Sequence, residues 1–253
     1  MRASLDWLTA RPVAHRGLHD TVQPRASGLI ENTAGAFRAA IEAGYAIETD
    51  VQISADGEAM VHHDDALGRL TEGEGRLDSF SASALKRVPF RGSAEHMMTL
   101  GELCDLVAGR ATMLVELKGR FDGDDRLATR VADVFARYRG PAAGMSFDLR
   151  QVMQLRQKAP GVARGMIAAD YRPNSYRDLL PPGSRRGLAY LRAGLSARPQ
   201  FLAYAVGGLP GLLPTFMRRI MCMPVLTWTV RTEAERQAAA RYADQMIFEG
   251  FRP

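Results

Sequence analysis

Short apolar runs alternate along the chain with longer segments in which apolar residues recur at helical spacing. The runs predict eight strands, at Pro12–His15, Ala46–Val51, Met113–Leu117, Gly144–Phe147, Gly165–Ala168, Phe201–Val206, Val225–Val230 and Gln245–Phe248. Helical spacing appears between most of them, as in Thr33–Ala43, Asp125–Tyr138, Leu149–Lys158 and Glu233–Tyr242. Asn32-Thr33 and Asp148 are predicted to cap the helices that follow them. Because strands that alternate with helices form βαβ units, the pattern predicts an α/β fold with a parallel sheet.

The length of the chain favours a closed barrel. Eight βα units in 253 residues fit a (β/α)8 TIM barrel, which typically needs about 250 residues. A doubly wound sheet is the competing arrangement, and the number of strands alone does not separate the two. The sequence contains neither a GxGxxG motif nor a GxxxxGK phosphate loop, which disfavours that competitor. We therefore expect residues 1–253 to form a single TIM-barrel domain.

Two neighbouring segments interrupt the regular alternation. Ser54-Ala55-Asp56-Gly57 has the composition of a turn and separates Thr49–Ile53 from Glu58–His62, which predicts a β-hairpin. The residues that follow, Asp65–Met98, show weak periodicity and contain several glycines. We expect residues 65–98 to form a small insertion after the hairpin of the second strand, over one face of the barrel.

The charge of the chain is mildly positive, with 33 lysines and arginines against 28 aspartates and glutamates, a net charge of +5. A basic chain suggests a nucleic-acid partner only if the charge is clustered. Here the arginines are scattered, and the densest pairs are Arg185-Arg186 and Arg218-Arg219. Motifs that combine aromatic and basic residues for base stacking are also absent. The composition therefore predicts no nucleic-acid partner.

Cysteines and apolar stretches exclude several other classes of protein. Cys104 and Cys222 form no CxxC pair, so we expect two buried free thiols, without a zinc site or a disulfide framework. The first residues contain no apolar run of signal-peptide length, and the expected location is the cytoplasm. The most apolar stretch, Phe201–Met217, is interrupted by prolines and glycines, and we interpret it as a barrel strand with its following loop. No stable membrane insertion is expected, although apolar residues before Arg218-Arg219 leave an interfacial membrane contact open.

Polar residues gather at the ends of the predicted strands, where the active sites of barrels lie. They are His15-Arg16 after the first strand, Glu48 and Asp50 in the second, His63 after the hairpin, and Glu116 and Lys118 at the end of the third. Side chains alternate across a strand, so Glu48 and Asp50 share a face, as do Glu116 and Lys118. If these faces line the barrel, three carboxylates converge near its mouth.

Three buried carboxylates need a countercharge. One divalent cation, Mg²⁺ or Ca²⁺, would supply it, since both bind oxygen ligands. Arg16 and Lys118 would add positive charge, which suits a phosphate ester, and His15 and His63 are candidates for general base and general acid. A structural ion-pair network is the competing explanation for a carboxylate pair, and a single histidine is more often structural. Their combination at three strand ends favours a functional site.

Ordered motifs along the chain resemble those of glycerophosphodiester phosphodiesterases of the cytoplasmic bacterial type. The N-terminal motifs are His15-Arg16-Gly17, Glu31-Asn32-Thr33, Ala36-Phe37, Ala40, Gly44, Glu48-Thr49-Asp50-Val51, Ser54-Ala55-Asp56-Gly57, Val61-His62-His63-Asp64 and Leu67-Gly68-Arg69-Leu70-Thr71-Glu72-Gly73. The later motifs are Val115-Glu116-Leu117-Lys118, Ser146-Phe147-Asp148 and Thr227-Trp228-Thr229-Val230. The resemblance spans nearly the whole chain, and the ordered set from His15 to Gly73 is highly specific.

The resemblance implies a TIM barrel with a small insertion after the hairpin, and it implies roles for individual residues. Those roles are metal ligation by Glu48, Asp50 and Glu116, acid/base catalysis by His15 and His63, and phosphate contacts by Arg16 and Lys118. Trp228 falls among the later positions that line the substrate pocket in the family, and a place in the barrel core is the alternative. Many relatives end their last strand with Thr-Asp, whereas this chain has Glu249, which leaves the pocket wall near that strand undetermined.

The implied activity is metal-dependent hydrolysis of a small glycerophosphodiester to sn-glycerol 3-phosphate and an alcohol. The nucleophile is either the adjacent glycerol hydroxyl, through a cyclic phosphate, or water, and either histidine could act first. Two other functions stay open. One is lysophospholipase D-like hydrolysis of a lipid phosphodiester, for which the apolar Leu209–Met217 segment is the only hint. The other is a catalytically silent phosphodiester-binding barrel. No particular oligomeric state is predicted.

Overall fold

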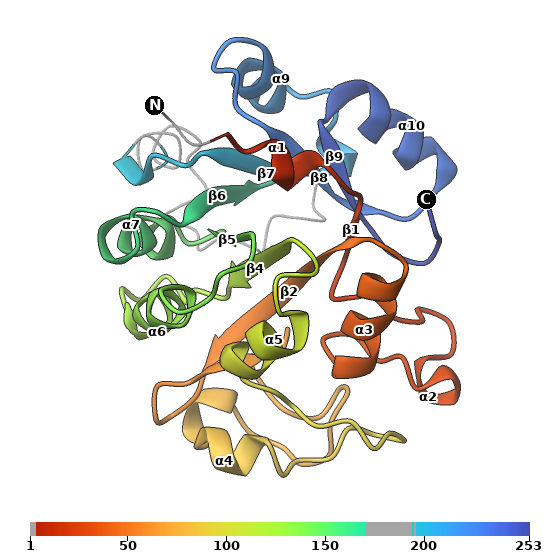
Figure 1. The fold of residues 1–253 in the computed structure, drawn as a ribbon, viewed down its shortest axis with the longest axis vertical. Helices are drawn as coiled ribbons and strands as arrows, with labels where there is room; N and C mark the ends of the chain where they lie inside the picture. The colour runs from red at the N-terminus through yellow and green to blue at the C-terminus, as the bar shows by residue number, and fades with distance from the viewer. Residues whose placement is uncertain (1–3, 171–193, 195) are drawn as a thin grey trace.

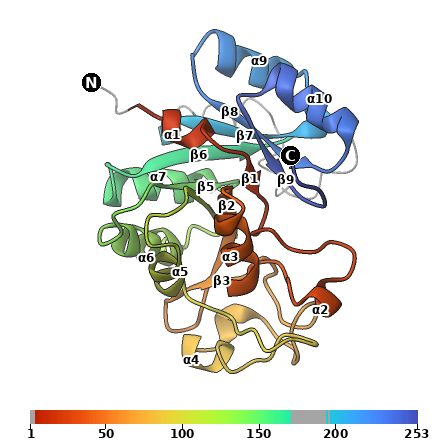
Figure 2. The same ribbon diagram turned by 45° about the vertical axis from the view of Figure 1, so that its right-hand side comes forward.

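Eight parallel strands close into a barrel in the computed structural model, which describes residues 4–170, 194 and 196–253 (Figures 1 and 2). The barrel strands are β1 (Val13–Ala14), β2 (Ala46–Ile53), β4 (Met113–Leu117), β5 (Ala142–Ser146), β6 (Ala163–Ala168), β7 (Phe201–Ala205), β8 (Val225–Val230) and β9 (Gln245–Phe248). Closure depends on β1, which pairs in parallel with β2 on one side and with β9 on the other. The TIM-barrel prediction is confirmed, and the doubly wound alternative is excluded.

Helices surround the barrel on its outside, as Figure 1 shows. The α-helices are α1 (Asp6–Thr9), α2 (Pro24–Ser27), α3 (Ala34–Glu42), α4 (Ala82–Leu85), α5 (Leu100–Val107), α6 (Arg126–Phe135), α7 (Leu149–Lys158), α9 (Leu212–Arg219) and α10 (Glu233–Tyr242). Two 3₁₀ turns are η1 (Leu77–Ser79) and η3 (Val206–Gly208). None of the helices in the described part of the chain is long and apolar enough to cross a bilayer.

Strand alternation divides the apolar residues between the inside and the outside of the barrel. On β2, Ala46 belongs to a cluster that fills the barrel interior, whereas Ile47 and Val51 pack outward in a second cluster with the helices. Leu8 of α1 joins the interior cluster at the amino ends of the strands, whereas Met145, Ile167 and Ile247 of the same cluster lie nearer the carboxyl ends of theirs. These three residues also line the cavity at the carboxyl end of the barrel, beside polar side chains.

The predicted hairpin is present, with β3 (Ala59–Val61) antiparallel to β2 and Val51 opposite Val61. The segment that follows contains η1 and α4 and gathers beside the carboxyl end of β2, at the bottom of Figure 1. It has a small apolar cluster of its own, which includes Leu77, Leu85 and Phe90. The boundaries proposed above for the domain and the insertion, 1–253 and 65–98, stay predictions.

Several local expectations are wrong. Phe201–Met217 is not only a strand with a loop, because Leu212–Met217 belongs to α9. Cys104 is buried as expected, but Cys222 is exposed, since it follows α9 at the surface. Thr33 occupies the N-cap position of α3 without capping it, because its hydroxyl donates instead to the Ile30 carbonyl, 2.7 Å away. Asp148 does cap α7, accepting from the Arg150 N–H. The Arg185-Arg186 pair lies outside the described residues.

Candidate active site

Six polar or aromatic side chains come two positions after an apolar residue of the barrel interior. The pairs are Val13 and His15, Ala46 and Glu48, Leu114 and Glu116, Met145 and Phe147, Leu226 and Trp228, and Ile247 and Glu249. Two residues advance a strand by about 7 Å and return the side chain to the same face. These residues therefore lie one layer above the apolar interior, at the carboxyl ends of the strands.

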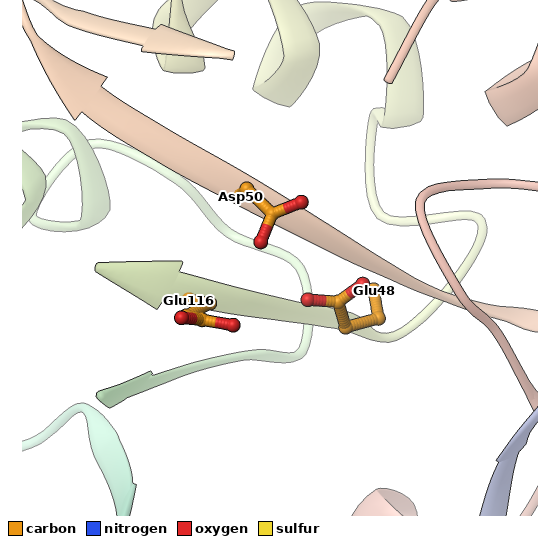
Figure 3. Close-up of side chains that lie close together, drawn as sticks. All are labelled: Glu48, Asp50 and Glu116. Carbon is orange, nitrogen blue, oxygen red and sulfur yellow. The ribbon is translucent and has the colours of Figure 1, made fainter. Parts of the chain in front are cut away.

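Three carboxylates converge at this end of the barrel. Glu48 and Asp50 come from β2 and Glu116 from β4, and Figure 3 shows the three side chains turned toward a common space. Asp50 is in register with Glu116 on the neighbouring strand, and each of the three offers an oxygen within 4.8 Å of the others. Glu48 and Asp50 are almost completely buried. The sequence-based expectation of a carboxylate cluster agrees with this geometry.

Two cationic side chains lie against the cluster. Lys118 Nζ is 2.8 Å from Asp50 Oδ1 and 2.8 Å from Glu116 Oε1, and Arg16 Nε is 3.2 Å from Asp50 Oδ2. The backbone N–H of Arg16 donates to Glu48 Oε2 at 3.0 Å. Burial alone would raise the pKa of Asp50, but Lys118 and Arg16 hold it well below its usual range. Asp50 is therefore ionised and tightly held.

The other two carboxylates lack enough positive charge. Burial, with Asp50 and Glu116 nearby, raises the pKa of Glu48 well above its usual range. Burial also raises the pKa of Glu116, although Lys118 opposes the shift. Three carboxyl groups share two cationic side chains. A further positive charge between the carboxyl groups would therefore stabilise all three in the ionised form. Three carboxylate oxygens within 4.8 Å of one another are close enough to bind one divalent cation between them.

His15 is held by a carboxylate of the last strand. Its Nδ1 contacts Glu249 Oε2, and its Nε2 lies 4.0 Å from Glu48 Oε2. Glu249 also accepts from Arg231 Nε at 2.6 Å. Burial lowers the pKa of His15, with Glu249 opposing the shift and the charge of Arg16 adding to it. The arrangement favours a neutral imidazole with Nδ1–H on Glu249 and Nε2 turned toward the cluster.

His63 is supported by a chain of ion pairs that leads back to Arg16. Its Nδ1 is 2.8 Å from Asp64 Oδ1, and Asp64 accepts from Arg69 Nε at 2.6 Å. Glu31 then joins the two arginines, accepting from Arg69 Nη2 at 2.6 Å and from Arg16 Nη1 at 2.8 Å. The orientation of the histidine is thus coupled to the position of the Arg16 guanidinium.

These groups open into one cavity of about 290 Å³. Its polar lining includes His15, Arg16, Glu48, His63, Glu116 and Lys118. Its apolar wall includes Phe147, Ile167 and Trp228, with the rings of Phe147 and Trp228 edge to face at 5.6 Å. Asp50 lies beneath this lining, 1% exposed. The geometry brings all eight predicted site residues together at one end of the barrel.

Comparison with known proteins agrees with the motifs. The sequence profile of the glycerophosphoryl diester phosphodiesterase family matches residues 15–251. The chain belongs to this family. It is 32% identical over 114 residues to a glycerophosphodiester phosphodiesterase from Caldanaerobacter subterraneus subsp. tengcongensis, an alignment that covers 42% of this chain and 44% of the relative. With a Bacillus altitudinis glycerophosphodiester phosphodiesterase the identity is 31% over 116 residues, covering 42% and 43%. These alignments thus span less than half of each curated relative.

A solved structure shares the barrel over almost its whole length. It is an Oleispira antarctica phosphodiesterase in complex with the product sn-glycerol-3-phosphate, with a TM-score of 0.76 and 19% identity. The superposition covers 96% of this chain and 94% of that one. At this identity the likeness establishes the fold alone.

Residues that the sequence analysis did not assign to the site complete this phosphodiesterase-family site. Asn32 donates from Nδ2 to Asp50 Oδ2 at 3.0 Å, and its Oδ1 accepts from the Thr49 hydroxyl at 2.8 Å. Asn32 lies in the left-handed region, with φ +58°, which turns its side chain to Asp50 instead of toward α3. The sequence signal that could have identified these residues was the motif Glu31-Asn32-Thr33. Helix capping accounts for Asn32 and Thr33 but gives no role to Glu31. Glu31 and Asn32 thus hold Arg16 and Asp50 in place.

His62 and His63 are adjacent, but only His63 faces the cavity. His62 is 1% exposed and lies near the ring of Phe90, with ring centroids 6.2 Å apart. Burial lowers the pKa of His62 to about 4, so it is neutral at physiological pH. The structure therefore separates a packed histidine from the one beside the carboxylates.

Gly17 permits the close approach of the first loop to α3. It lies at φ +80°, and a Cβ there would be 2.9 Å from the carbonyl carbon and the Cβ of Ala36. Gly17→Ala should lower the free energy of unfolding by about 2–4 kcal/mol, since it combines left-handed strain of about 1–2 kcal/mol with steric overlap. Thermal denaturation measures the loss. Gly57→Ala is the matched control, at φ +83° with nothing within 4 Å, and an equal loss in both variants would contradict the packing argument.

Proposed function

We propose that this chain hydrolyses glycerophosphodiesters to sn-glycerol 3-phosphate and an alcohol, with one divalent cation, Mg²⁺ or Ca²⁺. One observation carries the proposal. Two histidines that contact carboxylates, a buried acidic cluster and the cationic side chains of Arg16 and Lys118 all meet at one cavity. Membership of the family and the product complex of the Oleispira antarctica phosphodiesterase support the choice of substrate. Water adds across the bond between phosphorus and the alcohol oxygen, so atoms balance without a further reactant.

Glu48, Asp50 and Glu116 are the residues that would hold the cation, which when bound supplies Lewis-acid polarisation of the phosphoryl group. Arg16 and Lys118 supply fixed positive charge for the non-bridging phosphoryl oxygens as negative charge develops there. Both are anchored by carboxylates, so they need little reorganisation during the reaction. Asn32 keeps Asp50 oriented toward the cluster.

The histidines carry the two proton transfers. One accepts the proton of the attacking hydroxyl, which is that of water or of the adjacent glycerol carbon. The other donates a proton to the alcohol oxygen as its bond to phosphorus breaks. In each, Nδ1 faces a carboxylate, Glu249 for His15 and Asp64 for His63. That contact leaves Nε2 of each ring as the atom that exchanges protons with the substrate.

The wall formed by Phe147 and Trp228 offers an apolar surface beside this machinery. Their rings meet edge to face in the lining of the cavity, where the carbon atoms of a glycerol unit can pack. None of the described residues that line the cavity belongs to Leu209–Met217. The cavity therefore provides no acyl groove from that segment, and the small diester is preferred over a lipid.

A product assay tests the proposed activity. The purified chain is incubated with glycerophosphocholine, glycerophosphoethanolamine, glycerophosphoglycerol and lysophosphatidylcholine, each with Mg²⁺ or Ca²⁺. Release of sn-glycerol 3-phosphate from the soluble diesters is the expected result. Turnover of lysophosphatidylcholine alone would support the lysophospholipase alternative, and tight diester binding without turnover in any divalent metal would support a silent barrel.

Glu249 is proposed as a positioning residue that acts through His15. Glu249→Gln keeps the size of the side chain but removes the charge that fixes Nδ1–H, and we expect kcat to fall about 10–100-fold with KM nearly unchanged. Steady-state kinetics on a soluble diester measures the split. Glu233→Gln on α10 is the matched control, because Glu233 is an exposed carboxylate outside the cavity. An unchanged kcat in Glu249→Gln would show that the contact with His15 has no part in turnover.

A further inference from the structure

The outer face of α9 is apolar and exposed. Leu212, Phe216, Ile220 and Met221 are 94%, 48%, 68% and 48% exposed, and only Val22 joins them among the large exposed hydrophobic residues of the described chain. The exposed positions run as Leu212, Thr215, Phe216, Arg219 and Ile220, which is the spacing of one helical face. Single exposed hydrophobic residues need no explanation, but a contiguous face marks an interaction site.

A cavity of about 500 Å³ adjoins α9 and the loop that follows it. One side of it is formed by residues of α9 and of the loop that follows, Met217, Met221, Cys222 and Met223. The other side carries Arg156 of α7, Arg164 of β6 and Arg198 just before β7. This cavity shares no lining residue with the active-site cavity, and Arg164 and Gln200 place it toward the amino ends of the strands.

Among the residues that the structure describes, the three arginines of this cavity have no acidic partner. No carboxylate lines the described part of the cavity, and within residues 4–170, 194 and 196–253 none of the three forms an ion pair. Arg156 Nη1 donates to the Ser196 carbonyl at 3.0 Å, and Arg164 Nη1 donates to Gln200 Oε1 at 3.2 Å. Arg164 Nε is buried without an acceptor. Burial and the charge of Arg156 lower the pKa of Arg164, the reverse of the shift that an anion would cause.

The two features call for the same kind of partner. Unpaired guanidinium groups bind phosphate, since its oxygens match their donors. An apolar helical face with Arg219 at its edge inserts at the boundary between lipid headgroups and acyl chains. A small phosphate alone would leave Leu212, Phe216 and Ile220 in water, and an uncharged apolar partner would leave the arginines unpaired. An anionic phospholipid surface satisfies both.

We propose that α9 and the arginine cavity beside it dock the protein on an anionic phospholipid bilayer, with a lipid phosphate held by Arg156 and Arg164. Figures 1 and 2 place α9 on the outside of the barrel, far from α4 and the segment beside the active site. Docking through α9 therefore leaves the active-site cavity open to soluble substrate. The proposal is independent of the reaction that the barrel catalyses.

Vesicle flotation tests the proposal with the whole chain. The protein is mixed with vesicles of phosphatidylcholine alone or of phosphatidylcholine with phosphatidylglycerol, and the floated fraction is measured at low and high salt. We expect binding to the anionic vesicles only, weakened by salt. Phe216→Ser/Ile220→Ser and Arg156→Gln/Arg164→Gln should each lower the apparent affinity about 10–100-fold.

Two matched variants and a folding measurement control for general effects. Val22→Ser removes the other large exposed hydrophobic residue, and Arg87→Gln removes an exposed charge beside α4, far from α9. Both should float like the original protein. Circular dichroism and thermal denaturation of every variant show whether it is folded.

Four outcomes would overturn the proposal. They are no binding to either vesicle, equal binding to neutral and anionic vesicles, equal loss in the control variants, and binding of inorganic phosphate by calorimetry without any flotation. Self-association would also overturn it. If sedimentation velocity shows a dimer that Phe216→Ser abolishes, and the protein binds no vesicles, the α9 face belongs to a contact with a second copy of the chain.

Discussion

His63→Asn is expected to lower kcat on a soluble glycerophosphodiester by about 10²–10⁴-fold, and His15→Asn by a similar factor. Each substitution removes the ring nitrogen that we propose exchanges a proton with the substrate, and general acid or base catalysis contributes about that much. Steady-state kinetics under saturating metal measures the effect. Asparagine is small enough to leave the cavity walls in place, so KM should change much less than kcat.

A change of leaving group separates the roles of the two histidines. A diester with a nitrophenol leaving group needs little help from a general acid, because the nitrophenolate is a stable anion. The variant that lacks the acid should recover most of its activity on that substrate, whereas the variant that lacks the base should not. His96→Asn is the matched control, since His96 is exposed and lies outside the cavity. Nearly full activity in His15→Asn and His63→Asn would refute the acid/base assignment.

Removal of divalent metal is expected to abolish turnover and to lower the melting temperature. Without a cation, the buried carboxylates of Glu48, Asp50 and Glu116 repel one another, and a ligand present at 100 times its Kd stabilises the folded state by about 2.7 kcal/mol. For a domain of this size that corresponds to roughly 5–10 °C. Thermal denaturation with EDTA, Mg²⁺ or Ca²⁺ measures the shift without relying on activity.

Glu116→Gln tests whether the acidic cluster is the site of that effect. The variant removes one carboxylate, so the metal-dependent rise in melting temperature should shrink to a small fraction and activity should fall with it. Asp105→Asn on α5 makes the equivalent change at an exposed position, and its metal response should be unaltered. A full metal shift in Glu116→Gln would locate the cation elsewhere.

Much of the barrel and of the carboxylate cluster was predictable because both follow from strand alternation. Val225–Val230, Gln245–Phe248, Leu149–Lys158 and Glu233–Tyr242 have the bounds that the hydrophobic pattern predicts. The same alternation places Glu48 and Asp50 on the inner face of β2. Register supplies the rest, since parallel pairing of β2 with β4 brings Glu116 beside Asp50.

The contacts that orient the site were less accessible to sequence reasoning. Thr33 is a good capping residue, but tertiary structure directs its hydroxyl to Ile30 and turns Asn32 toward Asp50. The bond between Arg69 and Glu31 joins loops that are 38 residues apart, and no local propensity encodes it. Prolines and glycines lie within and beside the segment that forms α9. The composition of this segment therefore suggests a loop, even though it folds as a helix.

The contact between His15 and Glu249 joins residues 234 positions apart. During synthesis on the ribosome, the acidic cluster, both histidines and the hairpin are all made well before β9. Until β9 inserts between β8 and β1, His15 has no carboxylate on Nδ1 and the barrel is not closed. A nascent or partly unfolded chain that lacks this strand would therefore hold the acidic cluster and both histidines, and His15 would still lack the carboxylate that orients it. The strand that closes the barrel thus also brings in the last contact of the proposed site.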